Sequence, residues 1–330
     1  MFTKEILTID APAVATSVAE SIRQQVMGPL RRRGAVVGLS GGIDSSVVAA
    51  LCVKALGKER VLGVFMPERD SSDDALRLGR MLATHLGIEA VVEDIAPALR
   101  GLGCYDRQND AIRQVFPDYG DDWKCKITLP SILDSDRLNV FQLTVQAPDG
   151  RTETSRMPLA AYLQLVAATN FKQRVRKMME YYYADRLGYA VAGTPNRLEY
   201  DQGFFVKLGD GAADVKPIAS LYKTQVFALA RHLGVIDEIL EREPTTDTFS
   251  LAQSQEDFFY SVDYRTLDLV LWAKNHGVAH ATIARDVGLT EEQVARVCED
   301  IDQKRRSTAY LHAPPLLLER VVEVDEPAAG

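Results

Sequence analysis

Cysteine is scarce in this sequence, with four residues among 330, and the spacing of these residues excludes common uses of the thiol. The gaps between them contain no CxxC pair and fit no zinc-binding pattern. A disulfide framework is typical of much shorter secreted chains. We therefore expect reduced thiols that serve as packing residues in a cytoplasmic protein, at Cys52, Cys104, Cys125 and Cys298.

Long apolar runs and an excess of positive charge are also missing. No uninterrupted apolar stretch approaches the roughly 18 residues that span a bilayer, and the opening MFTKEILTID lacks the basic and apolar regions of a secretory signal. The net charge is −8, whereas duplex nucleic acid usually demands a basic face. Neither a membrane nor a nucleic acid is therefore an expected partner. Hydrophobic residues make up 46% of the chain, which is typical of a globular protein of about two domains or one large one.

The first third of the sequence alternates between expected strands and helices. Short apolar runs at 35–39, 60–66 and 90–92 are typical of buried strands. Apolar residues at helical spacing fill 47–55 and 75–86 between them. Later segments continue the pattern with a helix from 159, a strand at 189–193 and a helix at 222–233. This alternation predicts an α/β fold, doubly wound around a mostly parallel sheet.

Residues 104–158 interrupt this rhythm with many Asp, Pro and Gly residues. A strand at 140–147 followed by Pro148-Asp149-Gly150 predicts a hairpin within this excursion. We expect residues 1–260 to form one domain that carries the excursion, and 261–330 to be a helical extension of that domain whose last residues fray. Within it, 281–294 has the spacing of a DNA-binding helix-turn-helix, but a plain helical hairpin fits the negative charge better.

The most informative motif is Ser40-Gly41-Gly42-Ile43-Asp44-Ser45-Ser46, between an expected strand and an expected helix. Its glycines allow a tight turn, and the N–H groups of the turn and of the helix start form an anion cradle. Asp44 is an acid among phosphate-binding groups, which suits a bridging divalent cation. The GxxxxGK[ST] pattern of Walker A loops is absent, which argues against kinase-type phosphoryl transfer.

This SGGxDS loop resembles the pyrophosphate-binding loop of the ATP-pyrophosphatase group, whose members split ATP into AMP and pyrophosphate. Further motifs resemble those of the NAD synthase family within that group, and the resemblance covers roughly residues 15–100 and 160–310. The motifs are Asn170 to Arg176 (NxxxRxR), Gly193 to Glu199 (GTxNxxE), Gly203 to Gly211 (GFFVKLGDG), Asp214 to Ile218, Leu221 to Lys223, Pro244 to Asp247 and Lys304 to Arg306.

The resemblance implies a fold similar to the adenine nucleotide alpha hydrolases, and a role for each matching residue. It implies Mg²⁺ ligands at Asp44 and Glu199, and catalytic roles for Asp44, Lys223 and Thr245. The implied ATP contacts are Gly38, Leu39, Ser40, Gly41, Gly42, Ile43, Asp44, Ser45, Thr194, Lys223 and Thr245. The implied contacts to deamido-NAD are Asn170, Arg174, Arg176, Lys207, Asp210, Asp214, Gln303 and Lys304, with Gln303 standing where the family has His.

By this resemblance, the expected reaction is ATP-dependent amidation of deamido-NAD by ammonia, which gives NAD, AMP and pyrophosphate. The alternative is a related amide ligase that acts on a different carboxylic acid. An amidase domain and an N-terminal Cys nucleophile are not expected, because about forty residues precede Ser40 and Phe2 follows Met1. Ammonia is therefore expected to be free or supplied by a separate glutaminase. The resemblance also implies a homodimer with deamido-NAD at its interface, for which the 159–187 helix is the candidate seam.

Overall fold

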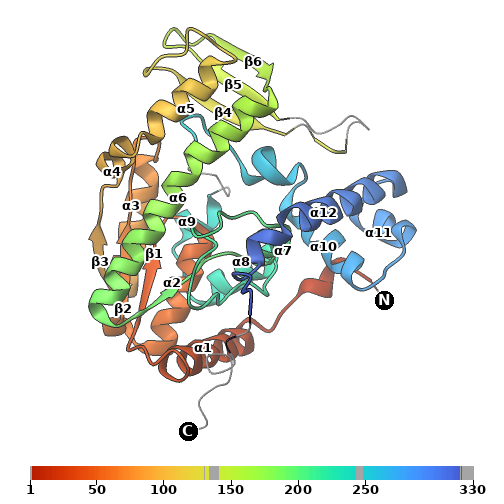
Figure 1. Cartoon of the computed structure of the whole chain (residues 1–330). Coiled ribbons are helices and arrows are strands. Elements are labelled where there is room, and N and C mark those ends of the chain that lie inside the picture. Colours follow the sequence, from red (N-terminus) through yellow and green to blue (C-terminus); the bar gives the residue numbers. More distant parts are fainter. Residues whose placement is uncertain (1, 130, 134–140, 243–247, 320, 322–330) are drawn as a thin grey trace.

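A four-stranded parallel sheet with strand order β3-β2-β1-β7 forms the centre of the molecule (Figure 1). This computed structural model describes residues 2–129, 131–133, 141–242, 248–319 and 321. The strands are β1 (Ala35–Gly38), β2 (Val61–Phe65), β3 (Glu89–Val92) and β7 (Ala190–Ala192). Val36 of β1 lies opposite Leu62 on one neighbour and Val191 on the other. The predicted parallel sheet is confirmed.

Helices cover both faces of this sheet. Successive strand residues point to opposite sides, and each face therefore carries apolar side chains that pack against helices. Ala35 and Val37 pack on one face with α1 (Ala11–Met27), α2 (Ile43–Leu56), α3 (Asp73–Leu86) and α8 (Lys223–His232). Val36 and Val64 pack on the other face with α4 (Ala96–Gly101) and the long helix α6 (Leu159–Leu187). The doubly wound arrangement is therefore confirmed, and α6 runs the length of one face (Figure 1).

The excursion at 104–158 forms a small unit at the end of α6 (Figure 1). It consists of α5 (Cys104–Arg113) and an antiparallel sheet of β4 (Lys124–Thr128), β5 (Gln142–Gln146) and β6 (Thr152–Arg156). The predicted hairpin is the β5–β6 pair. Helix α5 and strand β4 were not predicted, because CYDRQNDAIR is largely polar and KCKIT is only five residues long. Leu143 and Val145 nevertheless bury against Leu165 of α6 in a core of their own.

The C-terminal part is helical, as predicted. It contains α10 (Tyr264–Asn275), α11 (His280–Val287) and α12 (Glu291–His312), which enclose a separate core. Ile283 and Val294 are buried in that core, and the 281–294 segment forms the predicted helical hairpin between α11 and α12. The expected fraying concerns a tail whose residues 320 and 322–330 lie outside the described part.

Short elements connect these layers. They are the helices α7 (Arg197–Gln202) and α9 (Asp237–Glu241), the 3₁₀ turns Lys4–Leu7 and Lys58–Arg60, and the π-helical turn Glu256–Tyr260. The four cysteines are buried free thiols, as predicted. Within the described residues, no helix has the length and apolar character needed to cross a membrane.

Candidate active site

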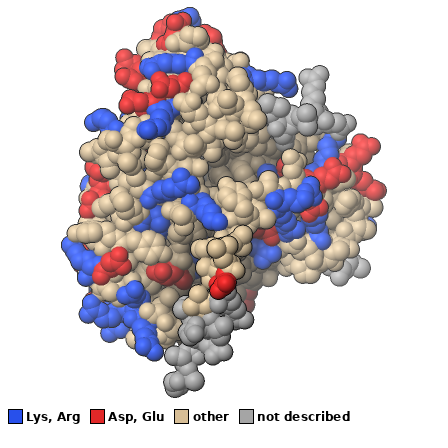
Figure 2. All heavy atoms as spheres, in the orientation of Figure 1, with Lys and Arg blue, Asp and Glu red and all other residues tan. Residues whose placement is uncertain are grey.

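A cavity of about 450 Å³ opens at the carboxyl end of β1, where parallel sheets usually bind their ligands. Its floor is the predicted cradle, which leads from β1 into the N-terminus of α2. Gly41 has φ +73°, and a Cβ there would lie 2.4 Å from the Ala75 carbonyl oxygen, so glycine is required for this turn. Figure 2 shows the surface hollowed between the excursion and the C-terminal helices, with Lys and Arg near the middle of this face.

Serine hydroxyls hold the cradle in shape. Ser45 Oγ donates to the Gly42 carbonyl at 3.0 Å and accepts from the Ser40 backbone N–H at 3.3 Å. Ser46 Oγ donates to the same Gly42 carbonyl at 2.8 Å. The Gly42 N–H donates to Ser40 Oγ at 3.3 Å. The N–H groups in the first turn of α2 have no acceptor within the helix, so they can bind an anion at the helix N-terminus. Except for Gly41, each predicted cradle residue from Gly38 to Ser45 lines the cavity.

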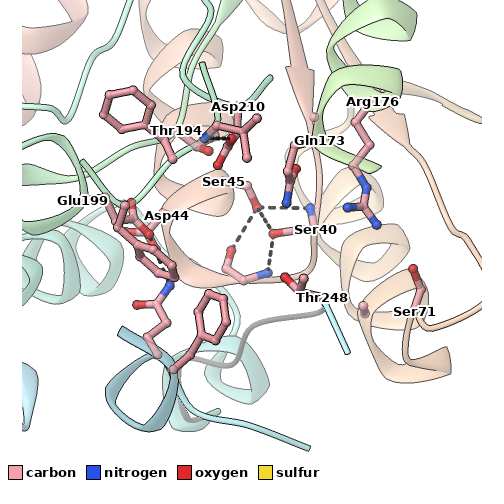
Figure 3. A pocket seen from close by; sticks show the side chains of 18 of the residues that line it. Ser40, Asp44, Ser45, Ser71, Gln173, Arg176, Thr194, Glu199, Asp210 and Thr248 are labelled. Atoms are coloured by element: carbon pink, nitrogen blue, oxygen red, sulfur yellow. Dashed lines mark hydrogen bonds between the residues drawn. The ribbon is translucent and has the colours of Figure 1, made fainter. Parts of the chain in front are cut away.

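Two carboxylates, Asp44 and Glu199, lie close together at the cradle (Figure 3), and a buried lysine contacts one of them. Lys223, at the start of α8, is 1% exposed and forms an ion pair with Asp44 Oδ2. Asn196 connects the two acids, because its side chain donates to Asp44 Oδ1 at 3.1 Å and its backbone N–H donates to Glu199 Oε2 at 3.0 Å. Gln255 Nε2 donates to the other Glu199 oxygen at 3.2 Å.

The pKa values of Glu199 and Lys223 are shifted because these side chains are buried close to one another and to Asp44. Desolvation of the Glu199 carboxyl, followed by the charge on Asp44, raises the pKa of Glu199 to about 8. Burial alone would lower the pKa of Lys223, but the negative charges on Asp44 and Glu199 outweigh it and raise that pKa. Lys223 is therefore a fixed positive charge. Asp268, which accepts from the backbone N–H of Lys223 and Thr224, holds the start of α8 in place.

The donor set beside the cradle fits Mg²⁺. Asp44 and Glu199 both line the cavity and offer carboxylate oxygens, the ligand type that Mg²⁺ prefers. Among the described residues no cluster of three or more His, Cys, Asp or Glu side chains is placed to hold a metal. A cation here would therefore complete its coordination with phosphate oxygens and water, which is the usual pattern for Mg²⁺ at a nucleotide.

One face of α6 forms a wall of the cavity. Asn170 and Arg176, two of the residues predicted to contact deamido-NAD, lie on this face, and Arg176 Nε donates to the Met66 carbonyl at 3.4 Å. Glu180 lies one turn further on, beside Gly38 of the cradle, and pairs with buried Lys177 at 2.6 Å. The sequence analysis missed Glu180, although its helical spacing from Arg176 could have revealed it.

Some of the other predicted site residues line this cavity, and others lie elsewhere. Thr194 and Asp210 line it, and Asp210 accepts from the Val206 backbone N–H at 2.7 Å. Thr245 lies outside the described residues. Five further predicted residues are not among those that line the cavity: Arg174, Lys207, Asp214, Gln303 and Lys304.

Most of these five side chains have other partners. Lys207 Nζ donates to the Tyr310 carbonyl at 2.7 Å, and Asp214 Oδ2 accepts from the Val191 backbone N–H at 2.7 Å. Lys304 Nζ donates to the Phe259 carbonyl at 2.7 Å and lies 4.7 Å from the centre of the Phe259 ring. Gln303 is exposed at the surface of α12. Within a single chain, the structure does not bring these residues to the cradle.

The doubly wound sheet, the glycine-serine cradle and the adjacent lysine and carboxylates together define a nucleotide-binding α/β enzyme of the ATP-pyrophosphatase group. The family model described as NAD synthase matches residues 14–114 and 140–309. The chain therefore belongs to the NAD synthase family.

Individual relatives support this assignment. A Mesorhizobium japonicum protein named NH(3)-dependent NAD(+) synthetase is 62% identical over 312 residues, which cover 94% of this chain and 98% of that relative. The protein of the same name from Rhizobium meliloti is 53% identical over 98% of this chain and 97% of its own length.

Solved structures show the same fold at lower identity. The NMN synthetase of Francisella tularensis aligns with a TM-score of 0.64 at 23% identity, over 94% of this chain and 98% of the other. The NH3-dependent NAD synthetase of Campylobacter jejuni aligns with a TM-score of 0.61, also at 23% identity, over 94% and 100%.

Proposed function

We propose that this protein is an ammonia-dependent NAD synthase, which uses ATP to convert deamido-NAD into NAD with release of AMP and pyrophosphate. The observation that carries this proposal is the 62% identity to a relative of that name over 94% of the chain. The cavity supports it, because Asp44, Glu199, Thr194 and Lys223 surround the cradle as the reaction requires.

The chemistry divides into two steps. First, an oxygen of the nicotinate carboxylate attacks the α-phosphorus of ATP, the bond to the bridging oxygen breaks, and pyrophosphate leaves. Second, the ammonia nitrogen attacks the acyl carbon of this adenylate, AMP leaves with the former carboxylate oxygen, and the nitrogen loses a proton. Negative charge develops on the departing pyrophosphate in the first step. The protein therefore needs positive groups and N–H donors at the cradle to stabilise it.

The chain's own residues supply these groups. The N–H groups in the first turn of α2 bind the β- and γ-phosphates, and Ser40 and Ser45 keep the turn in shape. Lys223 remains charged because of its acidic neighbours, and it opposes the charge on pyrophosphate. Asp44 and Glu199 would hold Mg²⁺, which would supply positive charge against the phosphates. Thr194 and Thr245 complete the ATP contacts in this proposal.

Deamido-NAD binding makes use of Asn170, Arg176 and Asp210, which line the same cavity. Arg176 supplies a charge-assisted hydrogen bond to the substrate's own phosphates. We assign the remaining predicted residues (Arg174, Lys207, Asp214, Gln303 and Lys304) to a site completed by a second copy of the chain, because they lie away from this cavity.

Helix α6 is the proposed seam of this homodimer. Its exposed residues Leu159, Leu163, Met178 and Tyr182 recur at four-residue spacing at each end of the helix, and each is more than half exposed. Large apolar side chains on one helix face gain free energy when a partner covers them. A separate glutaminase remains the proposed source of ammonia wherever free ammonia is scarce.

The test of this function is a comparison of acceptor acids. We expect ATP, Mg²⁺ and ammonium to give AMP with deamido-NAD, and far less with nicotinate mononucleotide, because the missing adenylate half supplies binding energy that positions the carboxylate. Asp44→Asn is the inactive control. AMP formation with another acid and none with deamido-NAD would instead indicate a related ligase with a different substrate.

A further inference from the structure

A second group of buried charges surrounds Lys172 of α6, and the proposed reaction does not use it. Lys172 is 1% exposed and is not among the residues that line the cavity. Its ammonium group donates to Glu68 Oε1 at 3.0 Å, to Asp70 Oδ2 at 2.6 Å and to the Thr248 carbonyl at 2.9 Å. An ammonium group has three N–H donors, so all three are used here.

The three acceptors belong to two segments that are distant in the sequence. Glu68 and Asp70 lie in the loop 66–72, which connects β2 to α3. Thr248 begins the described segment 248–319. Lys172 therefore ties both segments to α6, and no local structure of the chain connects them otherwise.

Neighbouring side chains reinforce the two carboxylates. Tyr105 of α5 donates to Glu68 Oε2 at 3.0 Å, and Arg69 Nε donates to Asp70 Oδ1 at 3.1 Å. Burial alone would raise the pKa of Asp70, but the positive charges of Lys172 and Arg69 outweigh burial and lower it. Asp70 is therefore held as a carboxylate opposite the ammonium group.

The two tied segments form part of the cavity wall. Ser71, Ser72 and Thr248 line the cavity, and Figure 3 shows Ser71 and Thr248 among the lining side chains. Ser71 Oγ accepts from the Glu68 backbone N–H at 3.1 Å, so the position of Glu68 is passed on to the lining residue. The Thr248 carbonyl is itself the third acceptor of Lys172.

This wall stands beside the phosphate cradle. Ser72 caps α3, because its Oγ accepts from the Ala75 backbone N–H at 3.2 Å. The Ala75 carbonyl oxygen in turn lies 2.4 Å from the position that a Cβ of Gly41 would take. A nucleotide whose phosphates rest on the cradle therefore lies next to the segments that Lys172 holds.

We propose that Lys172 is a positioning residue for ATP, which holds the loop 66–72 and Thr248 together as one wall of the nucleotide site. This inference rests on the proposed function, under which ATP is the substrate that occupies the cradle. Lys172 acts through the wall, because it lies outside the cavity. Without its charge, Glu68 and Asp70 become buried carboxylates that repel each other, and the Thr248 carbonyl loses its donor.

The test is the KM value for each substrate in Lys172→Met, which keeps a long side chain but removes the charge. Since a small displacement of a positioning group can cost about 100-fold, we expect KM for ATP to rise roughly 10- to 100-fold and KM for deamido-NAD to change less than about threefold. Asp70→Asn leaves Lys172 paired with Glu68, so this variant keeps a balanced pair and should show a smaller rise in KM for ATP.

Ile22→Ala is the control for a general loss of stability, because Ile22 is buried in the core under α1 and does not line the cavity. The inference is overturned if Lys172→Met and Asp70→Asn lower the melting temperature but leave KM for ATP unchanged, or if both KM values rise equally. If the wild-type protein makes no NAD, the proposed function fails, and calorimetric affinities for ATP in wild type and the same variants decide the role of Lys172.

Discussion

Asn196 connects two acids that arrive from different parts of the chain, and this connection shapes the chemistry of the site. Its amide holds Asp44, and its backbone N–H holds Glu199. The same side chain accepts from the N–H groups of Leu198 and Glu199 and so caps α7. One residue therefore fixes the helix start and the spacing of the proposed metal ligands, which is why we expect both carboxylates to be oriented before ATP binds.

The raised pKa of Glu199 makes stability depend on pH in a definite direction. This carboxyl keeps its proton up to about pH 8 in the folded chain, whereas the unfolded value is 4.5. Between those values the folded state binds more protons than the unfolded state, so this contribution to stability falls as pH rises. Relative to Glu199→Gln, which does not titrate, we expect the wild type to lose on the order of 4 kcal/mol between pH 5 and 8.5, since each pKa unit corresponds to about 1.4 kcal/mol.

Urea unfolding of both proteins at several pH values measures this difference. A constant difference between wild type and Glu199→Gln across the range would contradict the assigned pKa direction. Asp268, another acid with a raised pKa, is present in both proteins and therefore cancels in the comparison.

Two glycines of the cradle, Gly41 and Gly42, provide a matched pair for stability. Gly41→Ala places a side chain at φ +73° and 2.4 Å from the Ala75 carbonyl oxygen, whereas a Cβ at Gly42 meets only Ser40 Oγ at 3.3 Å. We expect Gly41→Ala to cost roughly 2 kcal/mol or more, and Gly42→Ala less than about 1 kcal/mol. Calorimetric melting of both variants checks this order, and equal losses would show that the turn is not constrained as described.

Arg176 and Arg174 offer a similar comparison for binding. Arg176 lines the cavity, whereas Arg174 Nε donates to the Lys207 carbonyl outside it. We expect Arg176→Ala to raise KM for deamido-NAD about 10- to 100-fold, the loss of a charge-assisted hydrogen bond, with a smaller change in KM for ATP. Arg174→Ala should have a weaker effect. Steady-state kinetics with each substrate varied in turn would refute this assignment if both KM values rose equally in Arg176→Ala.

Some residues of the site could be predicted from the sequence, and others could not. The cradle, Asp44, Glu199 and Lys223 were predicted together because their motifs are local, and the structure places all of them at one cavity. Residues two apart on a helix point about 200° apart, so Arg174 and Arg176 could not share one cavity of a single chain. Gln255 could not be predicted, because its contact with Glu199 joins segments that only the tertiary fold brings together.

Helix α6 is the element with most consequences for function. Tyr183 and Ala184 near its C-terminal end pack on the sheet, several residues from Tyr162 to Glu180 line the cavity, and large apolar side chains elsewhere on the helix are exposed. Its overall apolar pattern was predicted from sequence, but these separate contacts were not, because a helix with partners on several sides lacks a single apolar stripe.

The exposed face of α6 predicts a dimer that charge can disrupt. We expect the wild type to form the proposed dimer, and Met178→Asp combined with Tyr182→Asp to be monomeric at micromolar concentration, since two charges would have to be desolvated at the seam. Met27→Asp, a change of similar exposure at the end of α1, is the control and should leave the dimer intact. Sedimentation equilibrium measures this. A wild-type monomer that keeps full activity would contradict the proposed seam.

At the scale of the whole molecule, the cavity is bordered by three units with separate cores. The sheet supplies the cradle, the excursion supplies Ile127 and Phe141, and Phe259, near the C-terminal helices, supplies another part of the wall. The alternation of strands and helices predicted the first unit well. The excursion was predicted only as a hairpin, because its stability comes from burial against α6 rather than from its own sequence pattern.

The most direct test of the account is the product stoichiometry of the wild-type protein. With ATP, Mg²⁺, ¹⁵N-labelled ammonium and deamido-NAD, we predict that labelled NAD, AMP and pyrophosphate form in equal amounts, and that Asp44→Asn forms none of them at a comparable rate. Mass spectrometry of the nucleotides measures all of these products in one reaction. Formation of ADP and phosphate instead of AMP and pyrophosphate, or AMP without labelled NAD, would contradict the proposed activity.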